Sequence, residues 1–221
     1  RAVSITQVTE VGTLYTPDEL RELVACAHSN ELVVHVDGAR LANAAAAWLR
    51  RRTNAGGELS AVEALREVSS ASGIDVLSFG ATKNGLLFGE AVVFFNRELS
   101  ENYRYLRKQT TQLNSKMRYI SGQFLRYLQD DLWIDSALAA NDRARRLADG
   151  LDRIEGVSVA IPTEANAVFV ELPRRATPQL REEFGFYIWN EARNMARLMV
   201  SWDTTDETID RFIGRAIELC T

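Results

Sequence analysis

The sequence has 221 residues, which is enough to bury a hydrophobic core without disulfides or metal ions. Hydrophobic residues make up 46% and charged residues 25%, proportions typical of a globular protein and not of a disordered one. The formal net charge of -4 argues against a general nucleic-acid-binding protein, because neutralising phosphates requires a clustered basic face.

Cysteine content and hydropathy indicate the compartment in which the protein is expected. Cys26 and Cys220 are far apart and lack the spacing of zinc ligands, so the sequence predicts neither a disulfide framework nor a metal site. No apolar run reaches the roughly 18 residues that span a bilayer, and the N-terminus lacks the basic-then-apolar pattern of a signal peptide. We therefore expect a cytoplasmic protein that does not contact the membrane.

Strand and helix patterns alternate through the first half of the chain. Residues 3–8 are rich in strand-forming residues, and a helix should follow Thr16 and run to about residue 28. Thr16 and Glu19 can form a capping box around Pro17 at the first helical position. Further strands are predicted over 32–36, 75–79 and 90–95, and further helices over 41–49 and 60–70. This alternation predicts a parallel or mixed sheet covered by helices, the α/β class.

The second half of the chain has a different order of predicted helices and strands. From residue 99 to about 150 the period is helical without proline, so a long connecting helix or a helix pair is expected. Strands are then predicted over 157–161, 167–172 and 197–202, with helices from about Thr177 and Thr204; Thr204 and Glu207 have capping-box spacing. We expect a larger domain with its connecting helix over residues 1–129 and a smaller α+β domain over residues 130–221.

Two of the predicted strands end at residues that suit one chemistry. One leads into Asp37, and another leads into a glycine-flanked loop that carries Lys83. Open α/β sheets bind ligands at the carboxyl ends of their strands, where this acid and amine could meet. Pyridoxal phosphate needs an amine for a Schiff base, an anion for its pyridine nitrogen and a cation for the substrate carboxylate. Lys83, Asp37 and Arg40, or a later arginine, could fill these roles.

Each polar residue also has a purely structural interpretation. Asp37 alone is an ordinary cap between a strand and a helix, and Lys83 alone is a surface lysine. His28 is interpreted as a plain residue at a helix end. His35 shares a strand face with Asp37 and is a possible partner for it, but a hydrogen-bonded core histidine is the simpler interpretation. The pairing of acid and amine on consecutive strands is what favours a site.

Longer motifs around these residues resemble a known family. HVDGARL at 35–41, SFGATKNG at 78–85 and GEAVVFF at 89–95 resemble the threonine aldolase and β-eliminating lyase group of fold-type I pyridoxal phosphate enzymes. Further motifs follow in the order that the family uses: QVTEVGTLY at 7–15, SKMRY at 115–119, EANAVFV at 164–170 and ARLMVSWD at 196–203. The resemblance spans essentially the whole chain and is greatest to the bacterial low-specificity L-threonine aldolases.

The resemblance implies a partial large domain of the fold-type I class and a smaller C-terminal domain. It implies a pyridoxal phosphate-dependent lyase that cleaves L-threonine, L-allo-threonine or related β-hydroxy amino acids to glycine and an aldehyde. In that reading Lys83 carries the cofactor, Asp37 pairs with the pyridine nitrogen, and Arg40 and Arg197 bind the substrate carboxylate. Arg118 resembles the arginine that relatives place near the cofactor phosphate, often across a dimer interface. A homodimer or homotetramer is implied.

In the family, a preceding segment supplies the phosphate-binding turn, the ring stacked on the cofactor and the histidines placed for proton transfer. The chain resembles roughly the C-terminal two-thirds of a full-length enzyme, so no catalytic base is assigned within it. Two alternatives stay open. One is β-elimination or transamination of another amino acid with the same cofactor. The other is a non-catalytic fragment that retains only the scaffold and the dimer surface.

Overall fold

A computed structural model describes residues 1–220 and divides the chain into two compact units. The first unit comprises residues 1–9 and 15–136. The second comprises residues 10–14 and the chain from Ala137 onward. The chain passes from the first unit to the second inside the long helix α6 (Leu132–Leu151).

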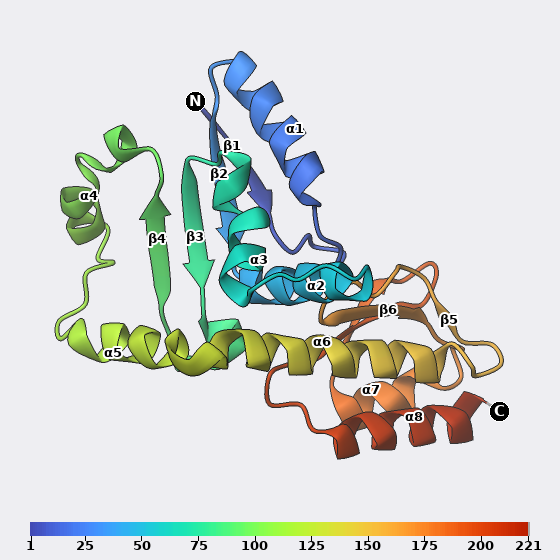
Figure 1. The fold of residues 1–221 in the computed structure, drawn as a ribbon. Coiled ribbons are helices and arrows are strands. Elements are labelled where there is room, and N and C mark those ends of the chain that lie inside the picture. The colour runs from blue at the N-terminus through green and yellow to red at the C-terminus, as the bar shows by residue number, and fades with distance from the viewer. Residues whose placement is uncertain (221) are drawn as a thin grey trace. The chain divides into compact units, whose positions relative to one another are not determined.

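The first unit contains a mixed four-stranded sheet (Figure 1). Its strands, in spatial order, are β1 (Ala2–Thr6), β2 (Val33–Gly38), β3 (Val76–Gly80) and β4 (Glu90–Phe94). The first three run parallel, and β4 pairs with β3 in the antiparallel direction. Val34 and Val36 of β2 are buried whereas Asp37 is exposed, so one face of this strand packs into the core. The predicted α/β class is confirmed.

Three helices accompany these strands in the first unit: α1 (Pro17–Ser29), α2 (Leu41–Asn54) and α3 (Ala61–Glu67). Helix α1 begins with the predicted capping box, because Thr16 accepts a hydrogen bond from the Glu19 backbone N–H and the Glu19 side chain returns to Thr16. Helix α2 buries a run of small residues, Ala44–Ala47, and packs against α3. The small side chains allow the close approach of its backbone to its neighbours.

The predicted long helix or helix pair after residue 99 is wrong, because the segment is broken into several pieces. They are the 3-10 turn η3 (Arg97–Ser100), α4 (Tyr103–Gln109), α5 (Arg118–Tyr127), the 3-10 turn η4 (Gln129–Asp131) and α6. Thr111, Lys116 and Asp130 have positive φ angles of 60°, 62° and 54°, which no helical residue adopts. No helix within residues 1–220 is long and apolar enough to cross a membrane.

The second unit contains an antiparallel sheet with helices on one face. Its strands, in spatial order, are β5 (Ser158–Val159), β6 (Ala167–Glu171), β8 (Met195–Met199) and β7 (Tyr187–Asn190), and its further helices are α7 (Thr177–Phe184) and α8 (Asp206–Cys220). Val168, Val170 and Leu198 join one core cluster with Phe212 of α8. The short edge strand β7 was not among the predicted strands.

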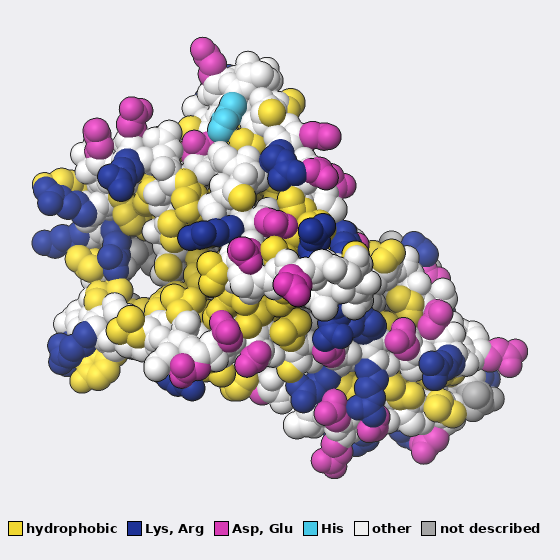
Figure 2. Space-filling model, viewed as in Figure 1, with side chains coloured by type: hydrophobic (Ala, Val, Ile, Leu, Met, Phe, Trp, Pro, Cys, Tyr) yellow, Lys and Arg dark blue, Asp and Glu magenta, His cyan; other side chains and the backbone are white. Residues whose placement is uncertain are grey.

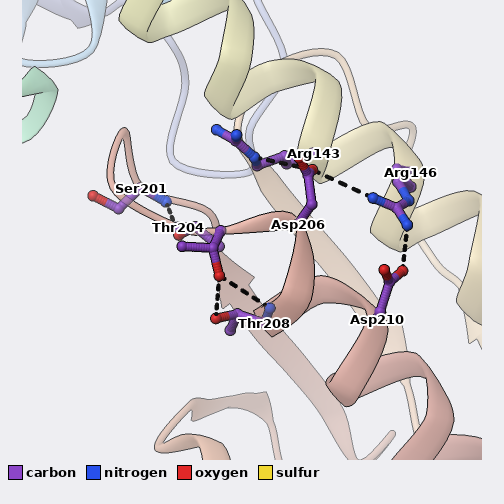
Figure 3. A network of polar contacts seen from close by, with 8 residues as sticks. Arg143, Arg146, Ser201, Thr204, Asp206, Thr208 and Asp210 are labelled. Carbon is purple, nitrogen blue, oxygen red and sulfur yellow. Dashed lines mark hydrogen bonds and ion pairs between the residues drawn. The ribbon is translucent and has the colours of Figure 1, made fainter.

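Two details of this unit depend on side-chain contacts at the start of α8. The Thr208 backbone N–H donates to Thr205 Oγ1 at 3.2 Å, whereas Thr204 Oγ1 accepts from the Ser201 backbone N–H at 2.9 Å. Thr205 therefore caps α8, and the predicted capping box of Thr204 and Glu207 is wrong by one residue. Figure 3 shows Thr204 and Thr208 near the contacts between α6 and α8.

Two arginines of α6 bind two aspartates of α8 on the surface of the second unit (Figure 3). Arg143 Nε lies 3.1 Å from Asp206 Oδ1, and Arg146 binds both Asp206 and Asp210. Arg146, Asp206 and Asp210 are about half exposed or more, so the net contribution of these ion pairs to stability is small. The apolar cluster beneath them holds the two helices together.

The segment 10–14 packs on the opposite face of the second sheet. Gly12 has a φ angle of +81°, and a Cβ atom there would lie 3.0 Å from the Cβ of Ala167. The Leu14 backbone N–H donates to Glu164 Oε2 at 2.9 Å, across 150 residues of sequence. These contacts place an N-terminal segment in the same unit as Arg197.

Candidate active site

Asp37 lies at the carboxyl end of β2, where the chain turns into α2. Its Oδ1 atom accepts a hydrogen bond from the Ala39 backbone N–H at 3.0 Å, so it has the local turn-forming role expected of an ordinary cap. The residue nevertheless remains exposed. A Cβ atom on Gly38 would lie 2.8 Å from the Ser78 carbonyl oxygen, so only glycine lets β2 approach β3 this closely at that point.

Lys83 lies on the short turn η2 (Thr82–Asn84), directly after β3. Both of its neighbours are held. Thr82 Oγ1 accepts from the Gly89 backbone N–H at 3.0 Å, and the buried Asn84 amide donates to Tyr127 Oη and to the Trp133 carbonyl, each at 2.7 Å. Lys83 itself is exposed between them. The sequence therefore positions an accessible amine on an anchored turn.

Glu90, the first residue of β4, lies beside both groups. It pairs with Gly80, and a Cβ atom on Gly80 would lie 3.1 and 3.2 Å from the two Glu90 carboxylate oxygens. Partial burial of the carboxyl group and the negative charge of Asp37 raise the pKa of Glu90, whereas the positive charge of Lys83 lowers it. Asp37, Lys83 and Glu90 therefore meet at one end of the sheet. The sequence pattern placed Glu90 within a motif without assigning it a role.

His35 bridges three strands on the sheet face that it shares with Asp37. Its Nδ1 lies 2.8 Å from Ser4 Oγ on β1, and its Nε2 lies 3.0 Å from Ser78 Oγ on β3. Both ring nitrogens are thus engaged by hydroxyl groups. The predicted hydrogen bonds of His35 are confirmed, but its placement in the core is wrong, because the residue is only partly buried.

His28 is more than a plain residue at a helix end, so that prediction is wrong. Its Nε2 lies 2.9 Å from Asp75 Oδ2, and the same oxygen accepts the Val34 backbone N–H at 2.8 Å. Burial works to raise the pKa of Asp75, but the Val34 N–H and the nearby His28 lower it by more, and the net pKa is below the ordinary value. The pair connects α1 to the start of β3.

Arg40 and Arg118 lie at the beginnings of two helices of the first unit. Arg40 is the N-cap residue of α2 and is partly buried, and its carbonyl accepts from the Ala44 backbone N–H at 3.2 Å. Arg118 is the first residue of α5 and is exposed, with its guanidinium 4.9 Å from the centre of the Tyr119 ring. Their roles in substrate and cofactor binding stay predictions.

Arg197 lies on β8 in the second unit, opposite Phe169 of β6 and Tyr187 of β7. Its guanidinium lies 5.3 Å from the Trp189 ring centre and 5.9 Å from that of Phe169, within the range of cation–π contact. Its side chain is 18% exposed, and its Nε has no hydrogen-bond partner among residues 1–220. A planar cation with an unused buried donor suits a carboxylate ligand.

Residues 1–173 match the family model described as Beta-eliminating lyase. The chain belongs to the β-eliminating lyase family. The family resemblance seen in the sequence motifs is confirmed, and members of this family are lyases that depend on pyridoxal phosphate.

Curated relatives of this β-eliminating lyase family chain bear the name low specificity L-threonine aldolase. The protein from Pseudomonas aeruginosa is 42% identical over 219 residues, which cover 99% of this chain and 59% of the relative. The protein from Pseudomonas sp. is 41% identical over 210 residues, or 95% of this chain and 57% of the relative. This chain therefore spans less than two-thirds of the length of these relatives.

Among solved structures, the threonine aldolase of Leishmania major is similar to the whole chain. The TM-score is 0.85 at 29% identity, and the match covers 100% of this chain and 61% of the other. Its fold agrees with the predicted fold class.

The residues of the first unit fit the cofactor of the β-eliminating lyase family. Lys83 is an exposed amine, and an accessible amine is what a Schiff-base attachment site requires. Asp37 is an exposed carboxylate on the adjacent strand, one oxygen of which is used by the Ala39 N–H. An accessible amine and an acid at the ends of adjacent strands are two of the groups that this cofactor needs.

Proposed function

We propose that the chain carries the lysine, the acid and the carboxylate-binding arginine of a pyridoxal phosphate-dependent lyase that cleaves β-hydroxy amino acids to glycine and an aldehyde. L-Threonine and L-allo-threonine are the expected substrates. The names of the curated relatives support this reaction, and the family match supports the cofactor.

One structural observation carries the proposal. Asp37 and Lys83 follow neighbouring parallel strands, with Asp37 in register with Ser78, and both act on the charge of Glu90. An acid and an amine at the carboxyl ends of adjacent parallel strands occupy the place where open α/β sheets bind ligands. An ordinary turn aspartate and an ordinary surface lysine would not need to converge.

The proposed residues have separate roles in binding the cofactor and in binding the substrate. Pyridoxal phosphate, when bound, supplies a protonated ring that accepts the electron pair left on Cα after the Cα–Cβ bond breaks. Asp37 would stabilise the positive charge of the pyridine nitrogen, and Lys83 would supply the amine that holds the cofactor. Arg197 and Arg40 bind the substrate carboxylate and so orient the bond to be broken.

The exposed apolar surface of the first unit supports the proposed homodimer or homotetramer. Figure 2 shows hydrophobic side chains exposed over the region of α4 and α5. Leu87 is 82% exposed and Leu125 is 74% exposed, and several more large side chains share this part of the chain: Phe88, Tyr105, Leu106 and Tyr119. A group of large exposed apolar side chains is typical of an interaction site.

The chain has only three lysines, so cofactor attachment can be tested residue by residue: Lys83, Lys108 and Lys116. We expect added pyridoxal phosphate to produce a visible absorbance band, and borohydride reduction followed by peptide mapping to find the label on Lys83. Lys83→Ala should abolish the band. Lys108→Ala and Lys116→Ala are matched controls that should retain it. A band that survives in Lys83→Ala contradicts the assignment.

Product analysis separates the proposed reaction from its alternatives. Retro-aldol cleavage of L-threonine yields glycine and acetaldehyde, β-elimination yields ammonia and a keto acid, and transamination yields a new amino acid. Glycine formed in equal amount to the aldehyde supports the proposal. Ammonia as the main product would favour β-elimination, and no cofactor band in the chain would favour a scaffold without catalysis.

A further inference from the structure

Glu90 is a carboxylate at the candidate site without an assigned role. It starts β4 directly after Gly89, whose backbone N–H binds Thr82 Oγ1 at 3.0 Å. This hydrogen bond closes the loop between η2 and β4 at its base. Lys83 and Glu90 each follow one of the two bonded residues, so this loop closure holds their backbones close to each other.

The Glu90 carboxylate has a defined position on the sheet. Both of its oxygens lie over Gly80, and a Cβ atom on Gly80 would also lie 2.8 Å from Ala39 Cα. A glycine at position 80 is therefore required for the carboxylate to lie there. Glu90 also lines a cavity of about 510 Å³ between β4 and the α4–α5 segment. The carboxylate thus lies between the sheet surface and an open cavity.

We propose that Glu90 is a further residue of this site, placed to take up a proton when Lys83 loses its positive charge. The inference rests on the proposed function. An amine attacks a carbonyl carbon only through its free electron pair, so the Lys83 ammonium must first lose a proton. The Lys83 Nζ then changes from +1 to neutral and the Glu90 carboxylate from -1 to neutral, so the net charge of the pair is zero before and after.

The charged groups around Glu90 support this coupling. Asp37 on β2 repels its negative charge, and Lys83 on η2 attracts it. Arg107 and Tyr103 of α4 line the same cavity. When the Lys83 charge disappears, burial and Asp37 remain and both favour the protonated carboxyl. The carboxyl of Glu90 therefore responds to the charge state of Lys83.

The first test needs no cofactor. In protein labelled at the glutamate carboxyl carbons, NMR follows the titration of Glu90, and Glu90→Gln identifies its signal. We expect the titration midpoint to move to higher pH in Lys83→Met and to lower pH in Asp37→Asn. Circular dichroism checks that both variants are folded. A midpoint that is the same in wild type and Lys83→Met overturns the role of Glu90.

The second test uses the loaded chain. The visible band formed with pyridoxal phosphate is recorded across pH in wild type, in Glu90→Gln and in the control Glu101→Gln, which changes an exposed glutamate elsewhere. We expect the pH midpoint of the band to fall by at least about half a unit in Glu90→Gln and to stay constant in Glu101→Gln. A band without any shift overturns the role of Glu90 alone. No band in wild type overturns the proposed function and the inference that rests on it.

Discussion

The side-chain amide of Asn84 donates hydrogen bonds to Tyr127 Oη and to the Trp133 carbonyl, each at 2.7 Å. Asn84 is buried, and burial also raises the pKa of Tyr127 to about 12, although the bond from Asn84 lowers it. Asn84 directly follows Lys83 in sequence. A buried polar contact therefore sets the position of an exposed amine.

Removing this contact should loosen the lysine turn and destabilise the first unit. Asn84→Ala deletes two hydrogen bonds and takes away the donor of the buried Tyr127 hydroxyl, so we expect a loss of about 2–3 kcal/mol in the free energy of unfolding. Tyr127→Phe removes only one partner and should cost about 1 kcal/mol. Urea denaturation measures both values. Equal stability of Asn84→Ala and wild type would show that the turn does not depend on this amide.

Gly80 should not tolerate a methyl group. In Gly80→Ala the new Cβ would meet Ala39 Cα at 2.8 Å and the Glu90 carboxylate at 3.1 Å, and the Ala39 backbone cannot move away cheaply. We expect a loss of roughly 1–3 kcal/mol from overpacking. Gly122→Ala on α5 is the matched control, because nothing lies within 4 Å there and helical alanine should stabilise by about 0.5–1 kcal/mol. In thermal denaturation we expect a lower melting temperature than wild type for Gly80→Ala and a higher one for Gly122→Ala.

Asp75 should make the free energy of unfolding depend on pH in the acidic range. Its folded pKa is lowered, so its stabilising effect is present above the ordinary aspartate pKa and is lost as the pH falls through the folded value. Asp75→Asn should cost about 1–2 kcal/mol near neutral pH, and the difference from wild type should vanish in acid. Denaturation at a series of pH values measures this.

Arg197 should be needed for its shape as well as its charge. Lysine retains the charge but loses the planar contact with Trp189 and the fork that binds a carboxylate. With L-threonine as substrate we expect KM to rise roughly tenfold to a hundredfold in Arg197→Lys, corresponding to about 1.4–2.7 kcal/mol, with a smaller change in kcat. Arg193→Lys, on the neighbouring surface and paired with Glu171, should leave KM unchanged. Steady-state kinetics on the two variants distinguishes these outcomes.

Local sequence was sufficient to predict most of the elements in the first 98 residues and to single out Asp37 and Lys83. The capping box at Thr16, the apolar run before Asp37 and the glycine-flanked loop around Lys83 are all short-range patterns. Such patterns specify structure because capping, side-chain alternation and turn geometry involve residues only a few positions apart. After residue 99 the prediction of a long helix is wrong, because the helical period of the sequence continues through residues that adopt positive φ angles.

Only the tertiary structure decided the contacts that join distant segments. Glu90 meets Asp37 and Lys83, His28 binds Asp75, and residues 10–14 pack in the unit that holds Arg197. No periodicity predicts these pairings, because each depends on which strands lie side by side and on the small side chains that let them approach. The sequence determined which groups are present at the ends of the strands, and packing determined which of those groups lie near one another.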